Sequence, residues 1–214
     1  YIFLDATRKR LFSAKYNQSI EKLEEQGLFF CMMSTPDIPE EILFSDDNVE
    51  LVGQLYALRL RDIFKNILSS DGQLAKCYDT AIGFFEDSCY KSCALTLMRN
   101  ISGYIEELRK AILVYNSFEK IKAFDYYETA AAKILSYYTK ITLPIEQWDA
   151  MSLNYDDIQK DNPAYNVTDL DCVRLFLLMS ATCELVSLFQ AVDWLVSKPN
   201  GMSKIEKILA IYKC

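Results

Sequence analysis

The sequence has 214 residues, of which none is histidine, 6 are glycine and 5 are proline. Because histidine is the commonest general base and transition-metal ligand, its absence excludes Ser-His-Asp and Cys-His hydrolases, HExxH zinc proteases and His-containing di-iron bundles. The net charge of −7 repels phosphate backbones, so we expect no nucleic-acid partner, and the scarcity of glycine and proline indicates a mostly helical protein.

Apolar residues at three- and four-residue spacing predict the first helix and its end. We expect this helix over residues 5–26, followed by Gly27, which can adopt the left-handed conformation that often ends a helix. The apolar run at 28–33 has no period that distinguishes helix from strand, and prolines follow it. We predict coil or a short helix there.

Two long helices are predicted next. The first starts at the polar residues 46–48, whose side chains can accept hydrogen bonds from its first amides, and it ends before Ser69 despite the interior Gly53. The second covers residues 73–99 as a single run of about seven turns, with a kink expected at Gly83.

Two further helices are predicted between Gly103 and Pro144, over residues 104–114 and 118–141. Proline lacks the amide hydrogen that a helix interior needs, so we expect it to close the second of them. Residues 144–169 hold two prolines among Asn and Asp residues, which predicts one short helix and a loop.

The helix predicted over about residues 170–196 is strongly apolar. Thr168 and Asp171 have the spacing of a capping box at its start, with Asp in place of the usual Glu or Gln. The stretch at 175–192 approaches the length of a membrane span, but Glu184 would lie near the bilayer centre at a cost of about 2.5–3.5 kcal/mol. We therefore expect a core helix of a soluble bundle, no membrane span, and an exposed Glu184.

A stop at residues 198–201 and a last helix over 202–212 complete the predicted elements. Together they predict an all-α fold, an irregular antiparallel helical bundle of six to eight helices around the central apolar helix at about 170–196. A single all-helical domain over residues 1–214 is the expected organisation. A degenerate helical-hairpin solenoid is the alternative, since antiparallel pairs of similar length could stack without a fixed repeat.

Sites for metals, nucleotides or cofactors are not indicated. Cys89 and Cys93 are four residues apart, but without histidine or a CxxC pair they complete no zinc site, and we expect them in the core. The sequence contains no glycine-rich phosphate loop. We expect no metal, no cofactor and no catalytic residue, and the catalytic alternative is an enzyme that uses only Asp, Glu, Lys, Tyr or Cys.

The seven cysteines are an odd number spread over predicted helices, which is typical of reduced core thiols rather than of a disulfide framework. Reduced thiols predict a cytoplasmic protein. Secretion is the alternative, because glycosylation sequons start at Asn17, Asn100 and Asn166.

Two segments concentrate negative charge. Eight acids and no base lie between Lys22 and Arg59, and seven acids face a single lysine in residues 146–171. Aromatic and methionine side chains set among polar residues are typical of interface hot spots. We therefore predict a partner-binding surface built from Trp148, Met151, Tyr155, Tyr165, Asp46, Asp47 and Glu50.

The lack of catalytic residues and the presence of these surface anchors favour a non-enzymatic protein-protein interaction module. It would be a helical adaptor, a complex subunit or a host-directed effector whose acidic and aromatic surface binds a protein partner with a basic surface. The alternative is a small-molecule or lipid binder with an apolar pocket inside the helical bundle. The sequence indicates no oligomeric state.

Overall fold

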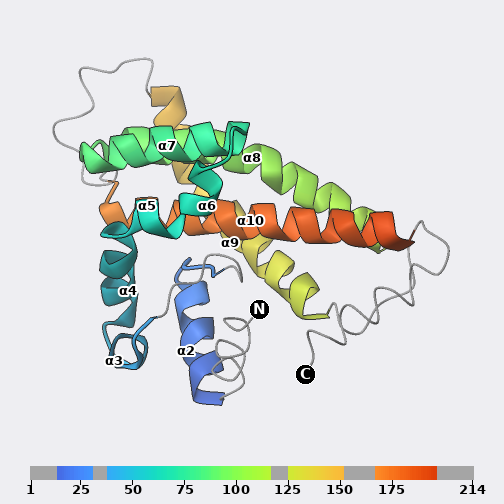
Figure 1. Ribbon diagram of the computed structural model, residues 1–214, viewed down its shortest axis with the longest axis horizontal. Coiled ribbons are helices and arrows are strands. Elements are labelled where there is room, and N and C mark those ends of the chain that lie inside the picture. The colour runs from blue at the N-terminus through green and yellow to red at the C-terminus, as the bar shows by residue number, and fades with distance from the viewer. Residues whose placement is uncertain (1–13, 31–37, 117–124, 152–166, 197–214) are drawn as a thin grey trace. The chain divides into compact units, whose positions relative to one another are not determined.

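A computed structural model describes residues 14–30, 38–116, 125–151 and 167–196, and every regular element in these ranges is a helix (Figure 1). The helices are α2 (Ala14–Glu25), α3 (Glu40–Leu43), α4 (Asn48–Ala57), α5 (Leu60–Ile63), α6 (Lys65–Leu68), α7 (Gln73–Glu86), α8 (Tyr90–Tyr115), α9 (Asp125–Met151) and α10 (Asp169–Val196). The predicted all-α fold class is confirmed. The helix predicted over 202–212 lies outside the described residues.

The chain divides into two compact units. Unit 1 comprises Tyr1–Leu97 and Asp161–Leu178, and unit 2 comprises Met98–Lys160 and Met179–Cys214. Helices α8 and α10 each begin in unit 1 and end in unit 2. This division leaves the expectation of a single domain untested, and each unit is described by itself below.

Gly27 ends α2 as the sequence predicts. Its φ of 87° is in the left-handed region, and its N–H donates to the carbonyl of Glu24 at 2.9 Å. The N–H of Leu28 donates to the carbonyl of Leu23, also at 2.9 Å, and both leucine side chains are fully buried. These two hydrogen bonds form a Schellman motif, which satisfies the last carbonyls of the helix.

The single helix predicted from residues 46–48 to Ser69 is wrong, because α4, α5 and α6 stand in its place (Figure 1). In a straight α-helix, each residue is rotated about the helix axis by about 40° relative to the residue four positions before it. A long stripe of residues at this spacing therefore turns gradually away from a fixed core. Arg59 leaves the helical conformation, with φ −131° and ψ 18°. After this break Leu60 and Phe64 are again buried, so tertiary packing has overridden the local helix pattern.

The expectation that a side chain caps the start of α4 is also wrong. Asp47 is the N-cap residue, but its side chain makes no hydrogen bond to the helix, and its own N–H donates to Ser45 Oγ at 3.3 Å. The buried side chain of Asn48 donates to the carbonyl of Leu43 at 3.2 Å. Because buried polar groups need partners, Asn48 ties α4 to the end of α3 instead of capping α4.

The predicted helix over 73–99 is wrong as well, since α7 ends at Glu86 and α8 begins at Tyr90, and the two run antiparallel (Figure 1). The chain turns at Ser88, which has a φ of 58°. The N–H of Ser88 donates to Phe85 and the N–H of Cys89 to Phe84, at 3.0 and 2.8 Å. The turn is therefore a second Schellman motif, with serine where glycine is usual.

We expect Ser88→Gly to raise the free energy of unfolding by about 0.5–1 kcal/mol. A left-handed L-residue is strained by roughly 1–2 kcal/mol, and glycine removes that strain while adding some entropy to the unfolded chain. Urea unfolding followed by circular dichroism measures the change. Ser102→Gly is the matched control: Ser102 is exposed in the interior of α8, where glycine should destabilise by a similar amount. Loss of stability in S88G would contradict the prediction.

Two predicted helix ends lie inside helices in the structure. Gly103 is an exposed interior residue of α8, and a Cβ added there would meet nothing within 4 Å. Pro144 does not close the preceding helix either, because α9 continues to Met151. An interior proline removes one backbone hydrogen bond and leaves the later residues free to pair with carbonyls four positions before them, so the helix can resume after it.

The capping box at the start of α10 is confirmed. The N–H of Thr168 donates to Asp171 Oδ2 at 3.0 Å, and the N–H of Asp171 donates to Thr168 Oγ1 at 3.2 Å. The prediction of a helix apolar on most faces is also confirmed, since residues 175–182 are buried without interruption. Eight consecutive buried residues cover every side of a helix. Glu184, expected to be exposed, is half-buried.

Among the described residues, one helix is long and apolar enough to cross a bilayer. It is the Asp169–Trp194 portion of α10, and 67% of its most apolar window is buried inside the protein. A core helix meets the same length and composition criteria. Our expectation that the chain has no membrane span stays a prediction.

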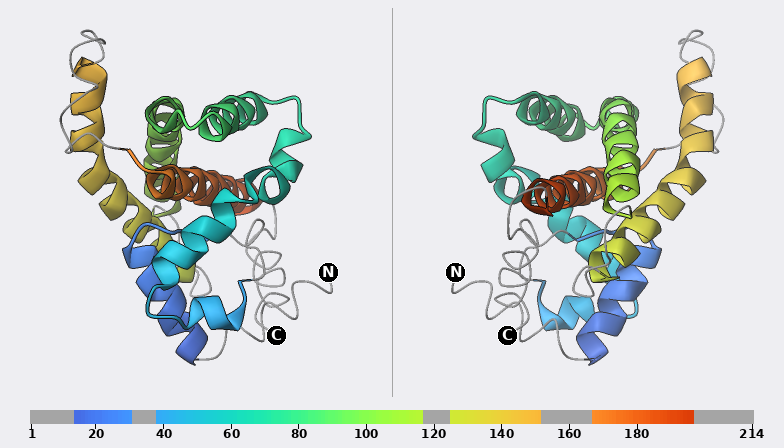
Figure 2. Two further views of the ribbon diagram at one scale, coloured as in Figure 1. Left: turned by 90° about the vertical axis from the view of Figure 1, so that its left-hand side faces the viewer. Right: turned by 90° about the vertical axis from the view of Figure 1, so that its right-hand side faces the viewer.

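Unit 1 is held together by aromatic rings around Phe176, which is fully buried near the start of α10. The ring centroid of Phe176 lies 5.8 Å from Phe64, 5.7 Å from Tyr78 and 6.4 Å from Phe85. The hydroxyl of Tyr78 donates to the carbonyl of Phe176 at 3.2 Å. These contacts join the α5–α6 junction, α7 and α10, and Figure 2 shows these helices from two sides.

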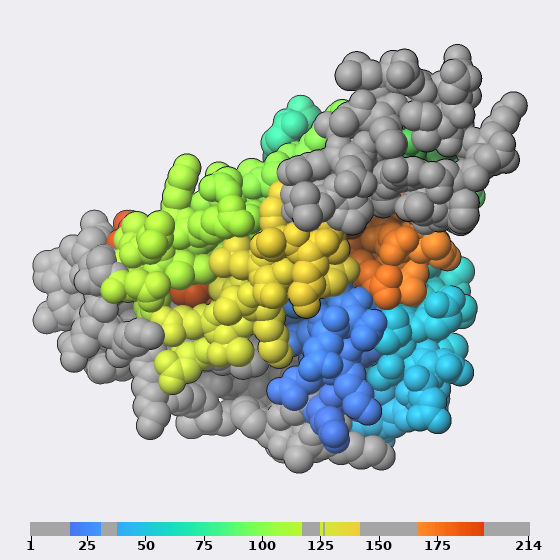
Figure 3. Space-filling view, turned by 180° about the vertical axis from the view of Figure 1, so that it is seen from behind, coloured from blue at the N-terminus to red at the C-terminus, as the bar shows by residue number. Residues whose placement is uncertain are grey.

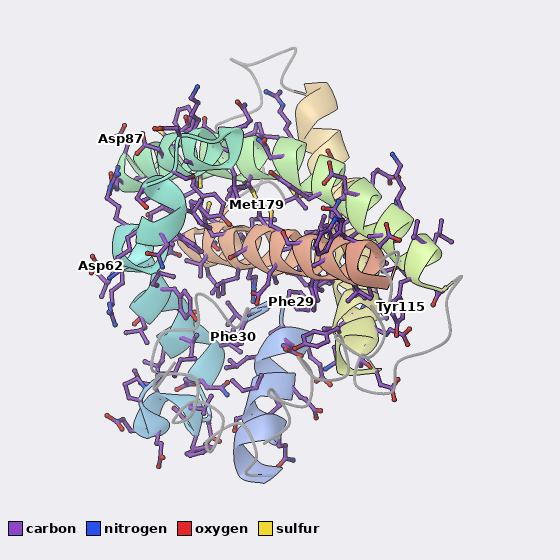
Figure 4. The ribbon with its side chains drawn as sticks, turned by 45° about the vertical axis from the view of Figure 1, so that its right-hand side comes forward. Phe29, Phe30, Asp62, Asp87, Tyr115 and Met179 are labelled. Atoms are coloured by element: carbon purple, nitrogen blue, oxygen red, sulfur yellow. The ribbon has the colours of Figure 1, made fainter. Side chains whose placement is uncertain are left out.

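Phe29 and Phe30 follow the end of α2 (Figure 4), and Phe29 is buried. The ring of Phe30 lies 6.0 Å from that of Tyr56 on α4. In unit 2, Tyr115 at the end of α8 makes an edge-to-face contact with Phe189 on α10, with centroids 5.4 Å apart. Aromatic contacts thus join helices in each unit.

Candidate partner-binding surface

The candidate site in unit 1 is the surface of α3, α4 and the turn between them. The turn is fixed from beneath by Leu43, which is fully buried, and by the Asn48 side chain bonded to its carbonyl. Figure 3 shows α3 and α4 adjoining α2 on the surface of unit 1. The backbone of this region is therefore anchored to the core, while its charged side chains face outwards.

Five carboxylates define what we call the α3–α4 acidic surface. All five are exposed, and none forms an ion pair with any residue that the structure describes. Three of them belong to the predicted partner-binding surface, whose binding role stays a prediction. The five are Glu40, Glu41, Asp46, Asp47 and Glu50.

Helix α4 has a buried face and an exposed face. Asn48, Val52 and Tyr56, spaced by four residues, form the buried one. On the exposed face Glu50 is followed four residues later by Gln54, whose Nε2 donates to Glu50 Oε1 at 3.4 Å. Four residues further on lies Leu58, 85% exposed at the end of the helix. Because residues at this spacing lie above one another, an apolar side chain continues the acidic face.

Arg61, a basic residue on the next helix after α4, is already paired with two acids. Arg61 on α5 donates from Nε and Nη2 to the two carboxylate oxygens of Glu86, at 2.7 and 2.8 Å, and from Nη1 to Asp79 at 3.1 Å. These bonds raise the pKa of the Arg61 guanidinium, and they hold the pKa of Glu86 below its ordinary value of 4.5. Figure 4 shows two further exposed acids of unit 1, Asp62 and Asp87.

We expect the bond between Arg61 and Glu86 to stabilise the protein at neutral pH and to fail in acid. Because the folded-state pKa of Glu86 is depressed, its contribution is present above about pH 4.5 and is lost as the pH falls through the folded value. Both side chains are half exposed, so the contribution at neutral pH is under about 1 kcal/mol.

Unfolding of the wild type and of Glu86→Gln, compared at about pH 7 and about pH 3, measures this contribution. The stability difference between the two proteins should shrink at the lower pH. Glu107→Gln, which neutralises an exposed acid with no ion-pair partner among the described residues, should show no such difference. A Glu86→Gln effect that grows in acid would contradict the sign.

The thiols of unit 1 form a separate cluster. Cys77, Cys93 and Cys172 are buried and free. Burial raises the pKa of Cys77 to about 11, and a hydrogen bond to Cys93 together with burial raises the pKa of Cys172. Such thiols stay protonated at neutral pH and are poor nucleophiles. No group of three or more metal-binding side chains was found among the described residues.

The expectation that Cys89 lies in the core is wrong, because Cys89 is exposed. It was placed on one helix face with Cys93, but the turn at Ser88 leaves it before the first residue of α8. Cys183 is half-buried and free, whereas Cys31 and Cys214 lie outside the described residues. Cytoplasmic localisation stays a prediction.

The predicted aromatic anchors fall outside the part of the chain whose side chains the structure describes. Trp148 and Met151 belong to the last turns of α9, where the structure describes the backbone but not the side chains. Tyr155 and Tyr165 lie outside the described residues. Trp148 and Met151 belong to unit 2, whereas the acids belong to unit 1. The expected single surface of acids and aromatics therefore stays a prediction.

The exposed apolar residues Leu58, Leu113 and Trp194 were not identified by sequence reasoning. Their side chains are 85%, 71% and 61% exposed. No pattern in the sequence distinguishes them from the buried apolar residues of the same helices. An exposed leucine alone is common, and Leu58 stands out because it continues a face of unpaired acids.

The α3–α4 acidic surface thus presents five exposed carboxylates, with the exposed side chain of Leu58 at the end of α4. Comparisons of this chain with protein-family models, with curated proteins and with solved structures found no match.

Proposed function

We propose that this chain is a non-enzymatic protein-interaction module whose α3–α4 acidic surface binds a protein partner with a basic surface. The observation that supports the proposal most is the group of five exposed carboxylates without an ion-pair partner among the described residues. Like charges this close on a small surface repel one another, and a basic partner relieves that repulsion.

Leu58 gives this surface an apolar contact. Charge complementarity increases the association rate and selects the partner, but buried apolar contacts supply most of the binding free energy. A partner that covers Glu50 and Gln54 would also reach Leu58, because the three lie on one helix face.

The charges are tested by a triple variant, Asp46→Lys, Asp47→Lys and Glu50→Lys. The matched control reverses three other exposed acids, Glu21, Glu107 and Asp193, and has the same net charge. Proteins captured from cell extract by the wild type and by the control variant should be lost with the triple variant, with affinity reduced roughly tenfold or more for a purified partner. Equal recovery with both variants would remove the acidic surface from the proposal.

Leu58→Ala tests the apolar contact separately. Because the side chain is exposed, we expect the free energy of unfolding to change by less than about 0.5 kcal/mol. Truncating an interface anchor costs about 1 kcal/mol or more, so the affinity for a partner captured through the acidic surface should fall roughly five- to tenfold. Leu113→Ala, an equally conservative change at an exposed leucine of unit 2, should leave that affinity unchanged. Equal affinity of L58A and wild type would exclude Leu58 from the interface.

A further inference from the structure

Two buried thiols of unit 1 are in contact with each other. Cys93 belongs to the first turn of α8 and Cys172 to the first turn of α10, and both are fully buried. The Cys172 thiol donates to the carbonyl of Tyr90 at 3.3 Å, and it is also hydrogen-bonded to the Cys93 thiol. Tyr90 lies three residues before Cys93, so both contacts of Cys172 are with the same side of α8.

We propose that Cys93 and Cys172 are a disulfide-forming pair, which a low-molecular-weight disulfide oxidises to a covalent link between the first turns of α8 and α10. Cysteines whose side chains point apart cannot be bridged without backbone movement. The Cys172 thiol is directed at the first turn of α8, which carries Cys93, and lies 3.3 Å from the carbonyl of Tyr90 in that turn. The structure gives the reduced form, in which both thiols are free.

The other thiols of the described residues are poorer partners for either cysteine. Cys77 also lies in the core of unit 1, but its thiol is directed at the carbonyl of Thr96, 4.0 Å away. Cys89 is exposed at the surface. Cys77 also interacts electrostatically with Cys93, but Cys172 is the thiol that is hydrogen-bonded to Cys93, which favours the pairing Cys93–Cys172.

The oxidation is a thiol–disulfide exchange in two steps. One buried thiol loses its proton and attacks a sulfur of glutathione disulfide, which breaks the glutathione S–S bond and releases one glutathione thiolate. The second cysteine then attacks the mixed disulfide, forms the Cys93–Cys172 bond and releases the second glutathione. The protein pair loses two electrons and two protons, and the glutathione disulfide becomes two glutathione thiols.

Burial makes this reaction slow rather than impossible. The thiols have no exposed area, and the neighbouring Asp169 and Asp171 carboxylates add to the burial and the thiol contact in disfavouring a thiolate at Cys172. The oxidant therefore reaches them only when the start of α8 or α10 opens locally. We expect the pair to react after the exposed Cys89 and to react faster in a denaturant concentration below the unfolding transition.

Trypsin digestion places the two cysteines in different peptides, so the pairing can be identified by mass. Cleavage after Lys and Arg leaves Cys93 in the peptide 92–99 and Cys172 in the peptide 161–174, each as its only cysteine, whereas Cys77 and Cys89 share the peptide 77–91. After incubation with glutathione disulfide, alkylation of free thiols and digestion without reductant, mass spectrometry should find 92–99 joined to 161–174.

Matched variants identify the pair. The link should form in Cys77→Ala and in Cys89→Ser, and it should disappear in Cys93→Ala and in Cys172→Ala. In the wild type the oxidised protein should melt about 5–10 °C higher than the reduced protein, because the bond closes a loop of about 80 residues in the unfolded chain, and a reductant should reverse the shift.

The proposal is overturned if peptides 92–99 and 161–174 are recovered alkylated under conditions in which Cys89 is completely glutathionylated and mild denaturant has opened the helices. A link from either peptide to 77–91 would overturn it equally. Both results are measured on the wild-type protein, so they do not depend on whether any variant folds.

Discussion

Phe176→Ala should destabilise unit 1 more than any other single truncation considered for this protein. Phe176 is fully buried, and its ring contacts Phe64, Tyr78 and Phe85. Truncation of a buried phenylalanine removes its apolar area from the core and leaves a cavity that neighbouring rings fill poorly. The expected cost is about 3–5 kcal/mol, which for a chain of this size lowers the melting temperature by about 10 °C.

Urea unfolding followed by circular dichroism measures this cost, with the midpoint and slope fitted together. Phe84→Ala is the matched control, because Phe84 lies on α7 of the same unit and is 36% exposed. Its cost should stay below that of F176A by more than about 2 kcal/mol, since its ring leaves no comparable cavity. Equal costs for the two variants would show that the ring cluster around Phe176 does not hold unit 1 together.

Local signals predicted the ends of two helices correctly. Gly27 needs no neighbour beyond its own helix to adopt the left-handed conformation, and Thr168 and Asp171 bond each other across three residues. The burial of α10 was also predictable, because a run of apolar residues on every face has no side suited to water. In each case the determining contact lies within a few residues of the signal.

The breaks at Arg59 and Ser88 were not predictable from such signals. Both lie within continuous helical periodicity, and both are set by distant packing: Leu60 and Phe64 turn back into the core, and α8 reverses onto α7. The error at Ser88 carried over to Cys89, which the assumed helix placed in the core. Tertiary contacts outweigh helix propensities of a few tenths of a kcal/mol per residue.

The sequence drew attention to three acids of the candidate surface but not to its apolar residue. Exposure of Asp46, Asp47 and Glu50 followed from their charge, because unpaired carboxylates are seldom buried. Leu58 was missed, since a single leucine after a polar helix face looks the same in sequence whether it is buried or exposed. Only the end of α4 and the departure of the chain at Arg59 decide that it is exposed.

Gly53→Val should destabilise the contact between α4 and α10. Gly53 is buried, and a Cβ added there would overlap Leu170 Cδ1 and lie 3.6 Å from Leu170 Cγ. Alanine at position 53 would have a higher helix propensity than glycine and would require only the end of the half-buried Leu170 side chain to move. Valine adds two methyl groups where one already overlaps, and overpacking of this kind costs about 1–3 kcal/mol.

A double-mutant cycle with Leu170→Ala shows whether the overlap is the cause. In the L170A background the valine should cost less than about 0.5 kcal/mol, which gives a coupling energy of about 1–2 kcal/mol. Gly83→Val is the control, because a Cβ there meets nothing within 4 Å and valine is favoured over glycine in a helix. If G53V costs the same with and without Leu170, the two side chains do not compete for space. The glycine in α4, which an ideal helix would avoid, would then be tolerated rather than required for the approach of α10.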